Sequence, residues 1–84
     1  MKDYLIIEYI KKLTVDDVKN FAKLKNINIS DSEAITLYNY IKNHYQELLN
    51  NDSKIIKEIK DQLNPNTFKE VYKLYLEYKI KYLS

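Results

Sequence analysis

Apolar residues recur at helical spacing along almost the whole chain. Side chains three and four residues apart share one face of an α-helix, so each such run predicts an amphipathic helix. The clearest run follows Ser30 and has the stripe Ala34, Leu37, Tyr38, Ile41, Tyr45 and Leu48. The other runs cover about Asp3 to Lys12, Thr14 to Lys25, Asp52 to Leu63, and Pro65 or Thr67 to Leu83. This pattern predicts an all-α fold, a compact bundle of four to five short helices with one extended connector.

Two of the predicted helices begin with a capping box. Thr14 precedes Asp17 by three residues, and Ser30 precedes Glu33 by the same spacing. In this motif the hydroxyl and the carboxylate each accept a hydrogen bond from the backbone N–H of the other residue. A carboxylate there also suits the positive end of the helix dipole.

Asparagines are expected to end the helices, because the chain has no glycine and Asn is the usual substitute in a left-handed position. The candidates are Asn26, Asn50 or Asn51, and Asn64. The start of the last helix has two readings. Either Pro65 takes the first helical position behind an Asn64 cap, or Thr67 is the cap and forms a box with Glu70.

The segment K-N-I-N-I-S, residues 25–30, alternates polar and β-branched residues and is too short for a sheet. We expect it to be the extended connector, with Ile27 and Ile29 entering the core. The residues expected on the buried faces of the shorter helices are Ile6, Tyr9, Ile10 and Leu13, then Val18, Phe21 and Ala22, then Ile55, Ile56, Ile59 and Leu63.

Composition limits the classes of function. Eighty-four residues suffice for one domain, residues 1–84, and 45% hydrophobic content is typical of a folded chain. The absence of cysteine removes disulfides and thiolate chemistry and favours a cytoplasmic protein. No apolar run is long enough to cross a membrane. The net charge is only +2 and every basic residue is lysine, so the bidentate contacts that arginine makes with phosphate and guanine are missing.

No catalytic, metal or cofactor site is predicted. His44 is the only histidine, and no spacing identifies a carboxylate that would orient it. The acidic pairs Asp16 with Asp17 and Asp31 with Glu33 lie at helix starts, where capping explains them. A chain without glycine also lacks the usual phosphate-binding loop. The sequence therefore predicts a protein that is not an enzyme.

The nine tyrosines and the last helix suggest an interaction surface. The apolar arc of that helix comprises Phe68, Val71, Tyr72, Tyr75, Leu76, Tyr82 and Leu83, with Leu74 and Ile80 beyond its margins. A bundle helix normally buries a narrower stripe, so either several neighbours cover this helix or part of it meets another chain. The candidate interface residues are Leu74, Tyr78, Ile80 and Tyr82.

Two resemblances add to this interpretation. Residues 13–34 resemble the helix, extended loop, helix motif of SAP, LEM and Rho N-terminal modules, with the pattern L-T-V-x-x-[LV]-K-x-x-A-K before an isoleucine-bearing loop. Such modules often bind DNA or RNA, so the resemblance implies nucleic-acid binding; in a weak, largely sequence-independent binder, the lysines we expect to contact the nucleic acid are Lys11, Lys12, Lys19, Lys23 and Lys25. However, Asn26 replaces a loop glycine, and the acidic S-D-S-E start of the second helix would repel phosphate.

The order of the T-x-x-D helix, the I-x-I-S connector and N-P-N-T-F-K-E-V is similar to a small Firmicutes family with a domain of unknown function. This resemblance implies a bacterial protein and transfers no activity. The favoured prediction is a non-enzymatic helical module that binds protein, either itself or another chain, with no cofactor and no membrane. Nucleic-acid binding is the less favoured alternative.

Overall fold

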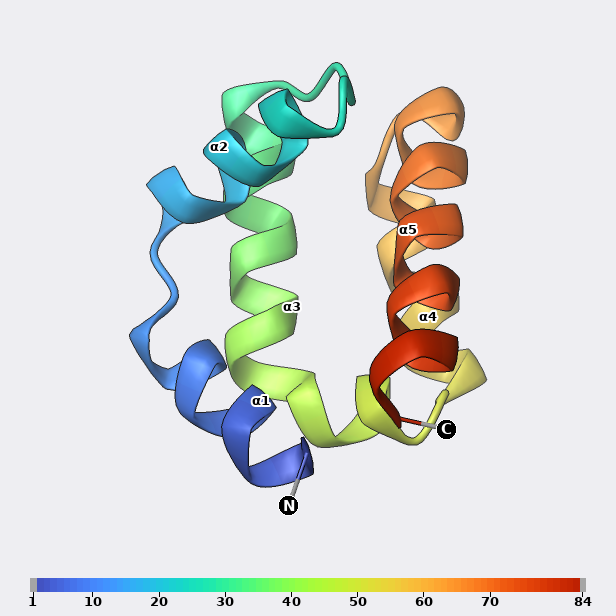
Figure 1. The fold of residues 1–84 in the computed structure, drawn as a ribbon. Coiled ribbons are helices and arrows are strands. Elements are labelled where there is room, and N and C mark those ends of the chain that lie inside the picture. Colours follow the sequence, from blue (N-terminus) through green and yellow to red (C-terminus); the bar gives the residue numbers. More distant parts are fainter. Residues whose placement is uncertain (1, 84) are drawn as a thin grey trace.

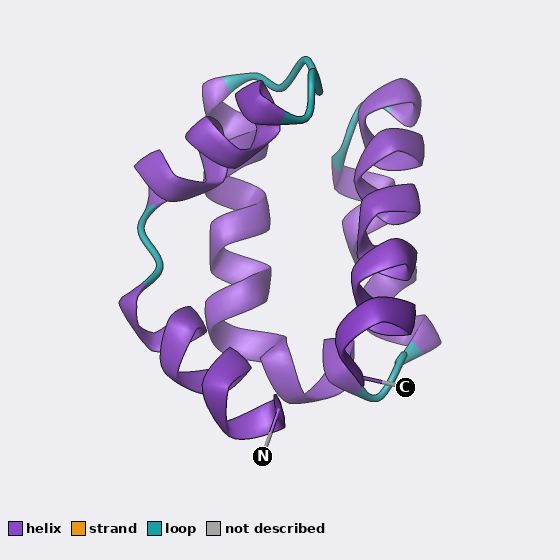
Figure 2. Ribbon diagram, viewed as in Figure 1, coloured by secondary structure: helices purple, strands orange, loops and turns teal. Residues whose placement is uncertain are grey.

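The computed structural model describes residues 2–83, with side chains for residues 7–77. Helices contain most of this part of the chain (Figures 1 and 2). In chain order they are α1 (Lys2–Lys12), α2 (Val15–Leu24), α3 (Asp31–Leu49), α4 (Ser53–Gln62) and α5 (Pro65–Leu83). No strand occurs among the described residues, so the prediction of an all-α bundle with an extended connector is confirmed.

The central helix is α3, which contacts α1, α2 and α4. Figure 1 shows α1 and α2 along one side of α3 and the pair α4 and α5 on the other. The last helix lies against α4 and also touches α1. The Cα radius of gyration is 12.1 Å, and a compact domain of this length is expected at about 12 Å.

Both predicted capping boxes are present. The Thr14 hydroxyl accepts from the Asp17 N–H at 3.1 Å, and the Thr14 N–H donates to the Asp17 carboxylate at 3.0 Å. At the start of α3 the corresponding distances between Ser30 and Glu33 are 3.2 and 3.1 Å. These local bonds satisfy backbone N–H groups that no helical carbonyl can reach, so they fix where α2 and α3 begin.

The asparagine prediction is right for two helix ends and wrong for the third. Asn26 and Asn51 each have a φ of 59°, the left-handed conformation expected after α2 and α3. Asn64 instead starts α5: its side-chain oxygen accepts from the Asn66 N–H at 2.9 Å, and Pro65 takes the first helical position. The alternative start at Thr67 is therefore wrong, since that side chain is buried and donates to the Asn28 carbonyl at 3.2 Å.

The core lies between α3 and α4. Its buried cluster is Leu37, Ile55, Ile59 and Leu63, with Val18, Ile29, Tyr40, Leu48, Phe68 and Val71 packed against it. Ile27 is buried as well, so both connector isoleucines enter the interior as expected. Every helix from α2 to α5 thus contributes to one apolar cluster, and the connector closes its end.

Two aromatic residues expected on buried faces are exposed. Tyr9 on α1 is 63% exposed and Phe21 on α2 is 36% exposed. Helix α2 meets α3 through the small buried residue Ala22, and Phe21 projects about 100° farther round the helix. The Lys25 ammonium lies 5.9 Å from the centre of the Phe21 ring, where a cation–π contact shields part of it. The side chain of Ile6 lies outside the described residues.

Helix α3 bends at His44, whose φ of −132° and ψ of 29° are not helical. No glycine or proline in this segment marks the bend in the sequence. On its N-terminal side, the Lys42 ammonium donates to the carbonyls of Ile10 at 3.0 Å and Lys11 at 2.7 Å. On its C-terminal side, the Leu48 carbonyl accepts from the Tyr75 hydroxyl. Contacts with α1 and with α5 thus lie on either side of the bend.

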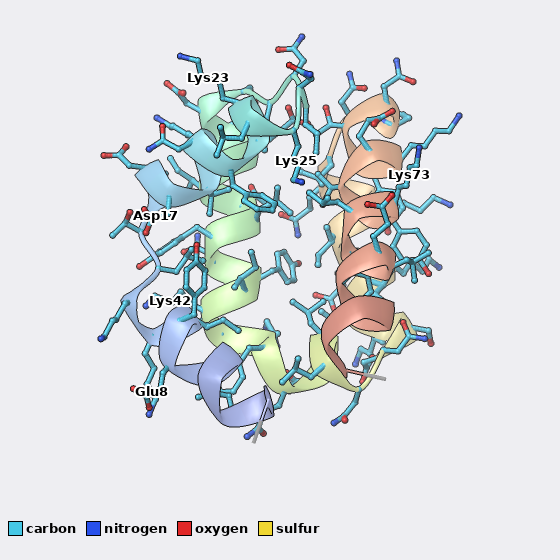
Figure 3. All side chains as sticks on the ribbon, viewed as in Figure 1. Glu8, Asp17, Lys23, Lys25, Lys42 and Lys73 are labelled. Atoms are coloured by element: carbon cyan, nitrogen blue, oxygen red, sulfur yellow. The ribbon has the colours of Figure 1, made fainter. Side chains whose placement is uncertain are left out.

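Lys42 is expected to hold α1 on α3. The change Lys42→Met removes a cation from two carbonyls at the negative end of α1, so it should lower the free energy of unfolding by about 1–2 kcal/mol. The measurement is urea unfolding followed by circular dichroism. The control Lys73→Met removes an exposed lysine on the outer side of α5 (Figure 3). Equal midpoints for both variants would contradict this role.

Candidate interaction groove

A groove of about 400 Å³ runs between α4 and α5. Its lining includes Ile56, Lys57, Lys60 and Asp61 from α4, with Phe68 and Tyr72 from α5. The groove exists because Ile55, Ile59 and Leu63, at a spacing of four residues, fill the core-facing stripe of α4. Ile56 therefore lies beside that stripe and is only half-buried.

The floor of the groove is aromatic. The Phe68 and Tyr72 rings stack one helical turn apart, with centroids at 5.4 Å and an interplanar angle of 14°. Tyr75 follows at 5.9 Å from Tyr72 but belongs to the interior, where its hydroxyl donates to the Leu48 carbonyl. Burial, with a smaller effect of Tyr72, raises the pKa of Tyr75. The Tyr72 ring therefore contacts Tyr75 on its interior side and Phe68 in the groove.

The apolar surface continues along α5 to Leu76, one turn beyond Tyr72. Leu76 is 38% exposed, which makes it one of the large hydrophobic side chains that the described part of the fold leaves in contact with solvent. Ile56, Tyr72 and Leu76, together with the ring of Phe68, form what we call the apolar floor. Nothing within the described residues covers this floor completely, since each member keeps part of its surface exposed.

Lysines border the apolar floor. Lys57 and Lys60 line the groove from α4, and Lys69 lies one turn before Tyr72 on α5. All three are exposed, and none takes part in an ion pair with another described side chain. Asp61 is the one acidic residue on the described lining. The groove therefore carries a positive rim.

The neighbouring carboxylate of Glu58 points elsewhere. It accepts from the Tyr40 hydroxyl at 3.2 Å, and the same hydroxyl accepts from the Gln62 amide at 2.7 Å. Desolvation together with the Glu58 charge raises the pKa of Tyr40. Glu58 is thus used to join α3 to α4 and does not neutralise the lysines of the groove.

The predicted interface residues are only partly placed by the structure. Leu74 is half-buried on α5. The side chains of Tyr78, Ile80 and Tyr82 lie outside the described residues. Sequence reasoning missed the contribution of α4, because it assigned Ile56 to a buried face. The sequence pattern did contain this information. Ile55, Ile59 and Leu63, four residues apart, form a complete buried stripe without Ile56.

The five lysines of the nucleic-acid alternative do not form one free patch. Lys11 pairs with Glu8 at 3.5 Å and Lys19 with Asp31 at 3.1 Å. Lys12 and Lys23 are exposed, and Figure 3 shows Lys23 pointing away from the bundle while Lys25 lies on the side of α2 that faces α5. Neighbouring carboxylates therefore reduce the field that this surface offers to phosphate.

His44 is half-buried at the bend of α3. Its Nδ1 lies 3.5 Å from the Glu47 carboxylate, and its ring lies 5.6 Å from that of Tyr40. This carboxylate lies three residues after His44, a spacing that places both side chains on one face of a helix, and sequence reasoning overlooked it. The described residues contain no group of three side chains suited to bind a metal ion. None of the described helices is long and apolar enough to span a membrane.

A second depression, of about 570 Å³, lies between the connector and the turn that joins α4 to α5. Its polar groups hold the fold together. One oxygen of Glu33 accepts from the Ser30 N–H, and the other accepts from the Asn64 N–H at 2.9 Å. Burial opposes ionisation of this carboxyl, but the hydrogen bonds from Asn64 and Ser30 outweigh it and lower the pKa of Glu33. Capping thus accounts for Glu33, as predicted, and the structure adds a long-range bond.

Comparison of this chain with protein-family models, with curated proteins and with solved structures finds no significant match. The resemblances to the SAP, LEM and Rho N-terminal modules and to the Firmicutes family therefore stay predictions. The same holds for a bacterial origin and a cytoplasmic location.

The long-range bond of Glu33 makes stability depend on pH. The change Glu33→Gln keeps one amide oxygen but loses the charge, so it should lower the free energy of unfolding at pH 7 by about 1 kcal/mol. A carboxyl whose pKa is lower in the folded state stabilises the fold above its unfolded pKa. The difference between wild type and variant should therefore be full at neutral pH and shrink as the pH falls below the ordinary value of 4.5.

The measurement is urea unfolding between pH 7 and about pH 3, which brackets the ordinary pKa of glutamate. The matched control is Asp17→Asn, because Asp17 also belongs to a capping box but its bond is to Thr14 within the same turn. A smaller loss is expected for the control. Equal losses at every pH would show that the bond to Asn64 contributes nothing beyond capping.

Proposed function

We propose that this protein is a non-enzymatic interaction module that binds a protein partner through the groove between α4 and α5. The supporting observation is the apolar floor, where Tyr72 and Leu76 stay accessible beside the half-buried Ile56. Large apolar and aromatic side chains in or next to one hollow are the usual anchors of protein interfaces. Ile56, Phe68 and Tyr72 line this one, and Leu76 lies one turn beyond Tyr72. The lysine rim around this floor is the usual polar border.

Other exposed apolar residues support the proposal less well. Leu24 is 79% exposed and Tyr9 is 63% exposed, but neither borders the groove or the polar depression. Single apolar residues on a surface are common and need no partner. The groove differs because it combines a hollow, a stacked aromatic pair and an exposed leucine.

Nucleic-acid binding through the lysines of α1 and α2 is the weaker proposal. Lys19 is paired with Asp31, and the start of α3 carries acidic residues where a helix dipole would otherwise attract phosphate. The groove provides lysines and aromatic rings together, but the two rings stack on each other and Phe68 packs against the core. A base would therefore find little free ring surface.

The test is site-specific photo-crosslinking in cells that express the protein, with benzoylphenylalanine in place of Leu76. We expect one discrete adduct, and its yield should fall at least about fivefold when Tyr72→Ser is added, because one bulky anchor residue commonly contributes 1 kcal/mol or more. The matched control carries the same probe in place of Leu24, the more exposed leucine. No adduct from position 76, or the same adducts from both positions, would contradict the proposal.

A further inference from the structure

The charge around the groove indicates what kind of partner it takes. Lys57 and Lys60 on α4 and Lys69 on α5 are exposed around the apolar floor, against the single carboxylate of Asp61 on the described lining. The whole chain has a net charge of only +2, and these three lysines with the one carboxylate of Asp61 already sum to +2 at this surface. A bound segment would meet lysine ammonium groups on both sides of its apolar contact.

We propose that the groove binds an acidic segment of a partner protein that presents a bulky apolar side chain between carboxylates. This inference rests on the proposed function and specifies the partner of the same site. The apolar side chain would occupy the hollow of about 400 Å³, which can hold one aromatic or leucine side chain above the Phe68 and Tyr72 rings. Carboxylates on either side would pair with Lys57 or Lys60 and with Lys69. Complementary charge of this kind selects the partner and speeds its association.

A second copy of this chain fits the groove less well. A symmetric dimer places the same surface of both copies face to face. Lys57 and Lys60 of one copy would then approach the same lysines of the other, and like charges in an interface cost affinity. A partner of opposite charge avoids this cost.

A nucleic acid also fits less well than an acidic peptide. Asp61 lies on the lining and would repel a phosphate backbone. No arginine is present to hold phosphate bidentately. A peptide can place its carboxylates on either side of Asp61, whereas a nucleic acid carries a phosphate at every residue.

The experiment is a titration of the isotope-labelled full chain, followed through its backbone amide signals by NMR. The probes are a short synthetic peptide with a central Phe-Leu pair flanked by glutamates, the same peptide with glutamines, and an oligothymidylate. We expect the acidic peptide to shift the signals of Ile56, Lys60, Tyr72 and Leu76, and to bind about tenfold more tightly than the glutamine peptide. Raising the salt from about 50 mM to about 500 mM should remove most of this difference.

The double change Lys57→Glu and Lys60→Glu should weaken binding of the acidic peptide by about tenfold or more, since it replaces attraction with repulsion. The matched control is Lys12→Glu with Lys23→Glu, the same charge change at exposed positions away from the groove, and it should leave the affinity within about twofold. The salt titration uses the wild-type chain, so it decides the question even if a variant does not fold.

The other outcomes separate this inference from the proposed function. Equal binding of the acidic and glutamine peptides at the groove would overturn the charge preference and leave the groove as a protein-binding site. No shift at the groove with either peptide would overturn both. Tighter binding of the oligothymidylate at these residues would assign the groove to nucleic acid. Groove signals that shift with protein concentration alone would assign it to a second copy.

Discussion

The bond between the Glu33 carboxylate and the Asn64 N–H constrains the position of α5, on which the groove depends. It joins the first turn of α3 to the turn before α5, and these two segments are 31 residues apart in sequence. The buried Thr67 hydroxyl adds a parallel link to the Asn28 carbonyl. Together they fix the end of the bundle, where the connector covers the core. The other described contacts of α5 are with α4, α1 and the end of α3. The bonds of Asn64 and Thr67 are therefore the polar contacts that position its first turn.

That positioning also creates the groove. Because Asn64 and Pro65 start α5 directly after α4, the two helices lie side by side and α5 turns Phe68 and Val71 toward the core. Tyr75 is then held by its bond to Leu48, on the same side. Tyr72 follows on the adjoining side of the helix and lines the groove with Ile56, and Leu76 lies one turn farther along the same face. The apolar arc of α5 is thus wider than its buried stripe because one part of it packs and the other borders the groove.

The parts of this structure that could be predicted are those set by local chemistry. Thr14 with Asp17 and Ser30 with Glu33 cap helices through bonds within a single turn, so spacing was enough to find them. The left-handed Asn26 and Asn51 are likewise local. The exposure of Phe21 and the bend at His44 belong to the way α1, α2 and α5 pack on α3, and a helical pattern contains no distance between helices. The groove was missed for the same reason. Helical spacing alone is consistent with a buried Ile56, and only the position of α5 shows that this side chain lines the groove.

The small net charge conceals an uneven distribution that follows from the same local rules. Carboxylates are favoured at helix starts, so Asp16, Asp17 and Asp31 gather there, and Glu33 is needed at the connector. Glu58 is occupied by Tyr40 on the far side of α4. These acidic residues lie near the connector or in contacts between helices, so Asp61 is the one carboxylate on the described lining of the groove beside its lysines. A chain of +2 can therefore still offer one basic surface, and it lies where apolar side chains are also exposed. That coincidence of charge and apolar area distinguishes the groove from the isolated Leu24 and Tyr9.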